Sequence, residues 1–243
     1  MEKEANTPCT ADNLTVYERK ILSDKDDITD LSAKERILKI AIKKFANYGY
    51  EKTSIRALAS VADVNISSIS YYFRDKEGLY KAVMEIICKR LSTDLFPVIK
   101  ENNKLLSEKN KNPAEVQKIV HDTFSKVVYY LINDEVSPYV SKILIREYLS
   151  PSKNFDDCYK STLFPIHNEM ATFFSKLANL DNKDERTIIC SHSILGMILV
   201  FKTHREVALR RLGWKSYGEE ELNKIAEVVI ENVNHLVAGY KKL

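Results

Sequence analysis

Apolar residues recur at intervals of three and four along most of this chain, which predicts helices rather than strands. The first clear helix begins at Ser32, because Ser32 and Glu35 form a capping-box pair in which each side chain satisfies a backbone N–H. We expect Gly49 to end this helix. Its expected buried stripe is Leu38, Ala41, Phe45 and Tyr48.

Two short helical patterns follow and meet at a tight turn. We expect Thr53 to cap the first and Asn65 the second, with the turn passing through Asp63, which tolerates the left-handed conformation. Helices this short cannot bury a core alone, so they must pack on a longer one. A small, polar-faced second helix beside such a turn is the arrangement that enters the major groove of DNA. The apolar positions are Ile55, Leu58, Ala59 and Ala62 in the first helix and Ile66, Ile69 and Phe73 in the second.

The rest of the chain predicts further helices separated by polar loops. One begins after Asp75 and either runs to Pro97 or kinks there. The fold class is therefore all-α, with a three-helix N-terminal domain that contains a helix-turn-helix, followed by a helical C-terminal domain; about nine helices are expected. The later helices are expected at about 113–133, 138–149, 155–180 with a kink at Pro165, 184–212 and 219–240.

Charge is distributed unevenly along the 243 residues, although the formal net charge is only +3. Residues 1–30 carry four basic against eight acidic residues and are weakly periodic, which predicts a flexible acidic leader. Residues 31–92 carry twelve basic and six acidic residues. The basic excess thus lies on the segment that holds the helical pair, as attraction to phosphate requires.

Several classes of protein are disfavoured by what the sequence lacks. It has no apolar run of about eighteen residues, so we expect a cytoplasmic protein with no membrane partner. The four cysteines lack metal-ligand spacing and are expected to be free thiols. We find no glycine-rich phosphate loop, no nucleophile paired with a base, and no paired metal ligands. The sequence therefore predicts no catalytic residues, no cofactor and no metal.

The segment 32–92 resembles the DNA-binding domain of the TetR family of bacterial transcription regulators. The residues that carry this resemblance are Ala41, Phe45, Gly49-Tyr50, Thr53-Ser54, Ile55, Ala59, Ala62, Val64, Tyr71-Tyr72-Phe73, Lys76-Glu77 and Leu79. The C-terminal part is similar to the CecR-type branch of the family, through Asn65-Ile66, residues 141–151, Pro165 to His167, HSILGMILVF and Arg211 to Trp214. The resemblance implies a DNA-binding domain over residues 31–92 and an effector-binding and dimerisation domain over residues 93–243.

Residue chemistry and the resemblance together indicate which side chains contact DNA. Hydroxyl groups and helix N-termini bind phosphate oxygens and lysine supplies charge, although the tyrosine pair could also be partly buried aromatic side chains. The exposed face of the second short helix offers mainly hydroxyls, which read bases weakly, so no operator sequence follows from it. The predicted DNA-binding residues are Thr53, Ser54, Asn65, Ser67, Ser68, Ser70, Tyr71, Tyr72 and Lys76.

The middle helices hold many aromatic residues, and such a stripe is ordinarily core. The resemblance implies that these helices also line a cavity for a small lipophilic or drug-like effector. Arg146 and Glu147 interrupt an apolar helix and could orient such a ligand, or equally form ion pairs between helices. Gly196 costs its helix about 1 kcal/mol relative to Ala and leaves room beside it. The predicted effector residues are Phe124, Tyr129, Arg146, Glu147, Phe164, His167 and Gly196.

The function that the sequence favours is a ligand-responsive, DNA-binding transcription regulator, a repressor rather than an activator. We expect a homodimer, formed through its last two helices, on a pseudo-palindromic double-stranded operator. The alternative is a helical ligand-binding or scaffold protein that has lost sequence-specific DNA recognition, because the second short helix offers so few base-reading groups.

Overall fold

The structure, a computed structural model, describes residues 21–22, 28–133 and 138–240, and every regular element in these ranges is helical. The predicted leader at residues 1–30 lies mostly outside the described residues. The chain divides into two compact units, each described here by itself. We call them the head unit, made of the described residues up to 91 and those of 138–162, and the body unit, made of residues 92–133 and 163–240.

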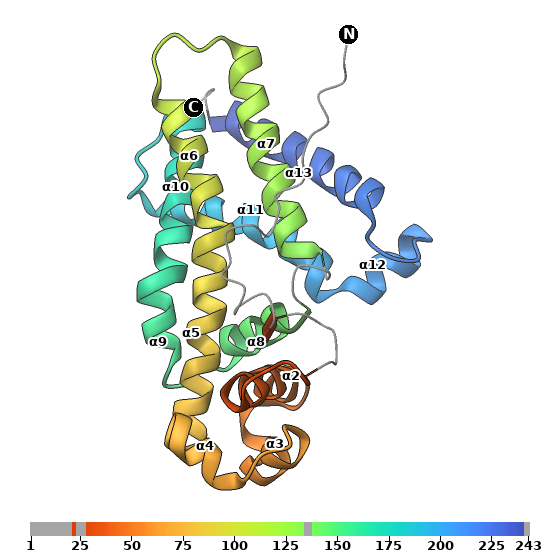
Figure 1. The fold of residues 1–243 in the computed structure, drawn as a ribbon. Coiled ribbons are helices and arrows are strands. Elements are labelled where there is room, and N and C mark those ends of the chain that lie inside the picture. Colours follow the sequence, from red (N-terminus) through yellow and green to blue (C-terminus); the bar gives the residue numbers. More distant parts are fainter. Residues whose placement is uncertain (1–20, 23–27, 134–137, 241–243) are drawn as a thin grey trace. The chain divides into compact units, whose positions relative to one another are not determined.

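The head unit contains the helix-turn-helix together with later helical elements of the chain (Figure 1). The first four of its elements, α2 to α5, surround a common core in which Phe45, Leu58, Ile69 and Leu79 are all buried. Burying each such side chain contributes roughly 1.5–3 kcal/mol. The elements are α2 (Ala33–Lys52), α3 (Ile55–Val61), α4 (Ile66–Phe73), most of α5 (Lys76–Asp94), α8 (Pro138–Leu149), α9 (Phe155–Cys158) and most of the π-helical turn η2 (Tyr159–Leu163).

The body unit is a bundle whose core contains Phe124 and Phe173, packed edge to face with ring centroids 5.9 Å apart. Asn112 and Glu115 form a second capping box at the start of α7. The elements are α6 (Phe96–Ser107), α7 (Pro113–Ile132), α10 (Phe164–Ala178), α11 (Glu185–Thr203), α12 (Arg205–Leu212) and α13 (Glu219–Tyr240).

The predicted starts of helices are largely confirmed. Ser32 and Glu35 form the expected capping box, with Ser32 N donating to Glu35 Oε2 at 2.7 Å. Asn65 caps α4, and Asp75 accepts the Gly78 N–H at 2.8 Å. The cap of α3 was predicted wrongly: Ser54 caps it, with its Oγ accepting the Ala57 N–H at 3.1 Å. Thr53, the predicted cap, instead follows the last residue of α2.

Some predicted helices are divided, and two predicted core residues are exposed. The expected helix at 155–180 is split into α9, η2 and α10, with Pro165 in the first turn of α10, where its missing N–H costs no hydrogen bond. The expected helix at 184–212 breaks at His204. Gly49 does not end α2 but kinks it, with φ of 81°. Tyr48 and Ile66 are 55% and 43% exposed. Each lies near an end of its helix, one turn away from a buried residue: Tyr48 follows Phe45, and Ile66 precedes Ile69.

The cysteines also differ from the prediction. Cys88 in α5 and Cys158 in α9 are both buried and form a disulfide, with Cα atoms 6.1 Å apart. They lie 70 positions apart in the chain, so no local spacing in the sequence signals the pair. Cys190 is free, as expected, and its sulfur lies 3.0 Å from the Tyr240 hydroxyl oxygen.

Candidate nucleic-acid interface

The turn between α3 and α4 is held by a side chain that the sequence did not single out. Arg36 in α2 donates from Nε to the Ala62 carbonyl at 2.9 Å and from its NH2 group to the Asp63 carbonyl at 3.2 Å. A third bond, 3.0 Å long, reaches the Leu31 carbonyl. Asp63 has φ of 51°, so the turn takes the left-handed conformation expected of it. By bonding to two carbonyls of the turn, the Arg36 guanidinium fixes the angle between α3 and α4.

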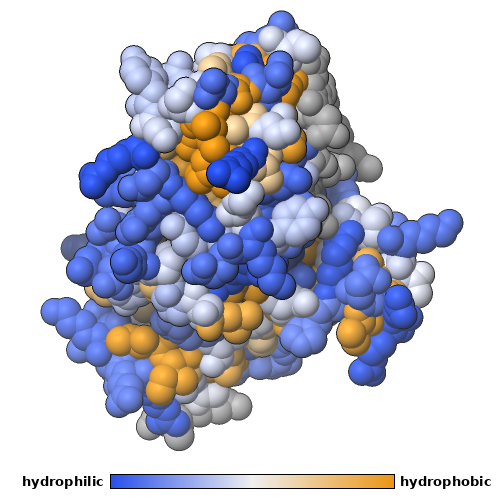
Figure 2. Space-filling view, turned by 90° about the horizontal axis from the view of Figure 1, so that it is seen from below, coloured by the Kyte–Doolittle hydropathy of each residue, from blue (hydrophilic) through white to orange (hydrophobic). Residues whose placement is uncertain are grey.

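The outer face of α4 is polar, as predicted. Ser67, Ser70 and Tyr71 are exposed, and Tyr71 is the most exposed of these at 83%. Ser68 is half-buried. The Asn65 side-chain oxygen already accepts the Ser67 N–H at 3.0 Å, so only its amide group stays available to a base or phosphate. Figure 2 views the side on which α3 and α4 lie in Figure 1, where hydrophilic residues predominate and hydrophobic ones form separate patches.

The end of α4 and the start of α5 bring hydroxyl and cationic side chains together in the sequence. Tyr72 is 40% exposed and packs edge to face against Tyr71, with centroids 5.0 Å apart. Arg74 has φ of 73° and a side chain that is 93% exposed, which makes it a candidate contact that sequence reasoning missed. Lys76 donates from Nζ to the Glu51 carbonyl at 3.3 Å and lies 4.3 Å from the centroid of the Tyr50 ring. Its ammonium is held by these two groups and keeps further N–H donors.

Thr53 and Ser54, the two predicted phosphate contacts before α3, differ in their accessibility. Ser54 is exposed, and its hydroxyl caps α3. Thr53 is only 5% exposed, and its Oγ1 donates to the Gly49 carbonyl at 2.7 Å. The Thr53 hydroxyl therefore stabilises the kink of α2, and its contact with DNA stays a prediction.

Gly78 marks a close approach between α4 and α5. A Cβ atom added to Gly78 would lie 2.1 Å from the Phe73 carbonyl oxygen, a backbone atom that cannot rotate away. Only glycine fits there without a backbone shift. The close approach fixes the end of α4 against the first turn of α5 and thereby places Tyr72 relative to Lys76.

The predicted effector residues are divided between the two units. Arg146 and Glu147 belong to the head unit, where Glu147 is buried against Tyr80 and Ser152. The other five lie in the body unit, but in different environments: Phe124 is core, Tyr129 and His167 are half-buried, and Phe164 and Gly196 are exposed.

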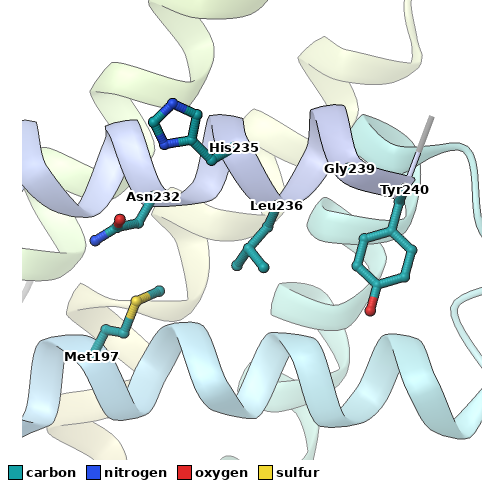
Figure 3. Close-up of a pocket in the computed structure, with 6 residues that line it drawn as sticks. All are labelled: Met197, Asn232, His235, Leu236, Gly239 and Tyr240. Carbon is teal, nitrogen blue, oxygen red and sulfur yellow. The ribbon is translucent and has the colours of Figure 1, made fainter. Parts of the chain in front are cut away.

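The larger groove described in the body unit lies between α11 and α13 and has a volume of about 430 Å³ (Figure 3). None of the predicted effector residues lines it. A second hollow of about 350 Å³ lies against α6 and α7, and its lining residues include Lys111, Glu115 and Asp122. The groove between α11 and α13 is lined by Met197, Asn232, His235, Leu236, Gly239 and Tyr240.

His167 and His192 stack in the body unit with ring centroids 4.8 Å apart. Burial, and to a smaller extent the neighbouring His192, lowers the pKa of His167 to about 4. His167 is therefore neutral near pH 7. Within the described ranges, no group of three or more His, Cys, Asp or Glu side chains could hold a metal ion.

The apolar helix α11 exposes much of its surface. Of the described helices it is the one long and apolar enough to cross a membrane, by length and composition only, and 28% of its apolar window is buried. The core helix of a soluble protein can meet the same criterion, so this helix alone is weak support for a membrane span. The large apolar side chains exposed on it are Ile188, Ile189 and Val200.

Comparisons with known proteins agree on one family. Residues 37–83 match the profile of the tetR family of bacterial regulatory proteins, and residues 116–240 match the C-terminal domain of the HTH-type transcriptional dual regulator CecR. The CecR protein of Shigella flexneri is 27% identical over 207 residues, covering 85% of this chain and 92% of that protein.

Solved structures show the same fold. The flavonoid-responsive regulator FrrA aligns with a TM-score of 0.53 at 17% identity, covering 84% of this chain and 96% of that one. The hemolysin II transcriptional regulator HlyIIR aligns with a TM-score of 0.52 at 22% identity, covering 81% and 96%.

Proposed function

Because the chain belongs to the TetR family of transcription regulators, we propose that it is a repressor that binds a pseudo-palindromic operator as a homodimer and is released by a small effector. Regulators of this family bind DNA operators and usually act as dimers with small-molecule effectors. The matching relatives are transcription regulators and not enzymes, and they act in the cytoplasm, where we place this chain.

The observation that carries the DNA-binding proposal is the set of exposed polar and cationic side chains on α4 and beside it in the head unit. The Tyr72 hydroxyl and the cations of Arg74 and Lys76 lie within five consecutive residues of the chain, and the exposed Ser54 caps α3 in the same unit. Hydroxyls, arginine and lysine are the groups that bind phosphate oxygens. The polar face of α4 supplies Ser67, Ser70 and Tyr71 for contacts in the major groove.

The dimer proposal rests on the apolar surface of α11 and α13. Ile189 and Val200 on α11 and Val228 on α13 are 57%, 43% and 54% exposed. Gly196 and Gly239 have nothing within 4 Å of an added Cβ, so a second copy could approach these helices closely. Covering this face would join two copies of the chain, and so two head units, in one dimer.

The effector proposal keeps a small lipophilic or drug-like ligand in the body unit, whose helices carry aromatic side chains that include Phe124, Phe173 and Phe174. Binding would favour a conformer in which the spacing of the two recognition helices no longer matches the operator. A ligand can shift this equilibrium only through its different affinities for the two conformers.

A salt titration separates this proposal from a helical protein that has lost DNA recognition. Binding to a fluorescent random-sequence duplex should weaken steeply with salt, because each phosphate contact releases counterions. Lys76→Ala should lower the slope of log affinity against log salt by about one unit, and Tyr72→Phe should weaken binding to all sequences alike. Lys104→Ala in the body unit is the control and should leave the slope unchanged. Absence of salt-dependent binding would favour the scaffold alternative.

A further inference from the structure

Glu147 is a buried carboxylate near the end of α8, with a relative exposure of 3%. It accepts three hydrogen bonds: from the Tyr80 hydroxyl at 2.5 Å, the Ser152 N–H at 3.0 Å and the Ser152 hydroxyl at 2.9 Å. A buried charge must be fully hydrogen-bonded, so these donors fix the carboxylate in place. Burial and the bond to Glu147 raise the pKa of Tyr80, which therefore stays protonated and keeps donating.

The Tyr80 ring links Glu147 to two aromatic residues of α2. It packs edge to face on Phe45 and on Tyr50, with centroids 4.9 and 5.1 Å away. Tyr50 in turn lies under the Lys76 ammonium, 4.3 Å from its ring centroid. A continuous row of contacts thus leads from Glu147 through two tyrosine rings to Lys76.

Arg146, the residue before Glu147, bonds to the end of α2 that also carries Tyr50. Arg146 donates from its NH2 group to the Asn47 carbonyl at 3.2 Å and from Nε to the Ala46 carbonyl at 3.4 Å. These carbonyls precede the kink at Gly49, beyond which Tyr50 and Glu51 support Lys76. Two adjacent residues of α8 therefore contact the segment that supports Lys76, Arg146 directly and Glu147 through Tyr80.

We propose that Glu147 is a positioning residue for DNA binding: through Tyr80 and Tyr50 it holds the Lys76 ammonium where it can bind a DNA phosphate. The inference rests on the proposed DNA-binding function and deepens it. By sequence, α8 lies within residues 116–240, which match the CecR C-terminal domain, but by its contacts it belongs to the head unit. A change at Glu147 can therefore alter the position of the Lys76 ammonium through the contacts of Tyr80 and Tyr50.

A double-mutant cycle on the salt slope tests the proposal. Tyr80→Phe keeps the ring but removes the donor to Glu147, and it should lower the slope on random duplex DNA by about one unit, as Lys76→Ala does. Because both variants remove the same phosphate contact, the double variant should have the slope of Lys76→Ala alone. Glu147→Gln should lower the slope in the same way. Tyr48→Phe, on the exposed side of α2, is the matched control and should retain the original slope.

The slope separates positioning from loss of structure, because a smaller folded fraction reduces the apparent affinity but not its dependence on salt. An unchanged slope in both Tyr80→Phe and Glu147→Gln, with Lys76→Ala lowered, would overturn the positioning role while leaving DNA binding intact. Additive losses in the double variant would overturn it too. An unchanged slope in Lys76→Ala would remove the phosphate contact itself, and with it both the positioning role and this part of the proposed function.

Discussion

Gly78→Ala offers a sharp test of how the head unit is assembled. The new Cβ would lie 2.1 Å from the Phe73 carbonyl oxygen, so the end of α4 must move by about 1 Å to reach ordinary contact. Forced backbone shifts of this kind cost up to about 3 kcal/mol. Alanine returns about 1 kcal/mol of helix propensity, so we expect a net loss of about 2 kcal/mol.

For a chain of this size, such a loss lowers the melting temperature by roughly 4–8 °C, which circular dichroism would detect. Binding to random duplex DNA should weaken as well, because the shift separates Tyr72 from Lys76. Lys104→Ala, at an exposed position of helix α6, is the control and should change the melting temperature little. If Gly78→Ala left the melting temperature unchanged or raised it, the close approach of α4 and α5 would be refuted.

Three further outcomes are expected. Replacing Cys88 and Cys158 together by serine should lower the free energy of unfolding by about 4 kcal/mol relative to the oxidised protein, because the disulfide closes a loop of 70 residues; equal denaturation midpoints in both proteins would argue against the bond. A chain ending before Asp184 lacks α11 and α13 and should sediment as a monomer or aggregate, whereas a stable dimer would place the interface elsewhere. His167 has a folded-state pKa of about 4, below its unfolded value, so its contribution to stability is complete above about pH 6.5 and is lost as the pH falls toward 4, by up to about 3 kcal/mol. His167→Gln should flatten that part of a plot of stability against pH, and an unchanged plot would show that another group titrates.

Local sequence chemistry determined most of the helix boundaries. The capping boxes at Ser32 and Asn112 and the cap at Asn65 depend on residues within three positions of each other, so their geometry follows from the chain itself. The left-handed turn at Asp63 is equally local. The exposed hydroxyls of α4 followed from the same pattern, since a helix that packs on one side presents the other to solvent.

Prediction from the sequence failed where two positions compete for one role, and it was incomplete where contacts join distant segments. Thr53 and Ser54 are adjacent and both capable of capping; the kink at Gly49 decides between them, because it draws the Thr53 hydroxyl inward. Glu147 was predicted either to orient a ligand or to form an ion pair with another helix, since a charge in an apolar helix needs a partner. The sequence could not show that the partner is Tyr80, 67 positions away.

By itself, the sequence determined an all-helical chain of the TetR family with a polar recognition helix, because periodicity, caps and turn residues act over one or two turns of backbone. Only the tertiary structure decided that α8 packs on α2, that Cys88 meets Cys158, and that Arg36 holds the turn. Each of these contacts joins segments whose approach depends on how whole helices pack. Packing selects partners by shape and by the need to satisfy buried polar groups, and neither is written in the spacing of residues along the chain.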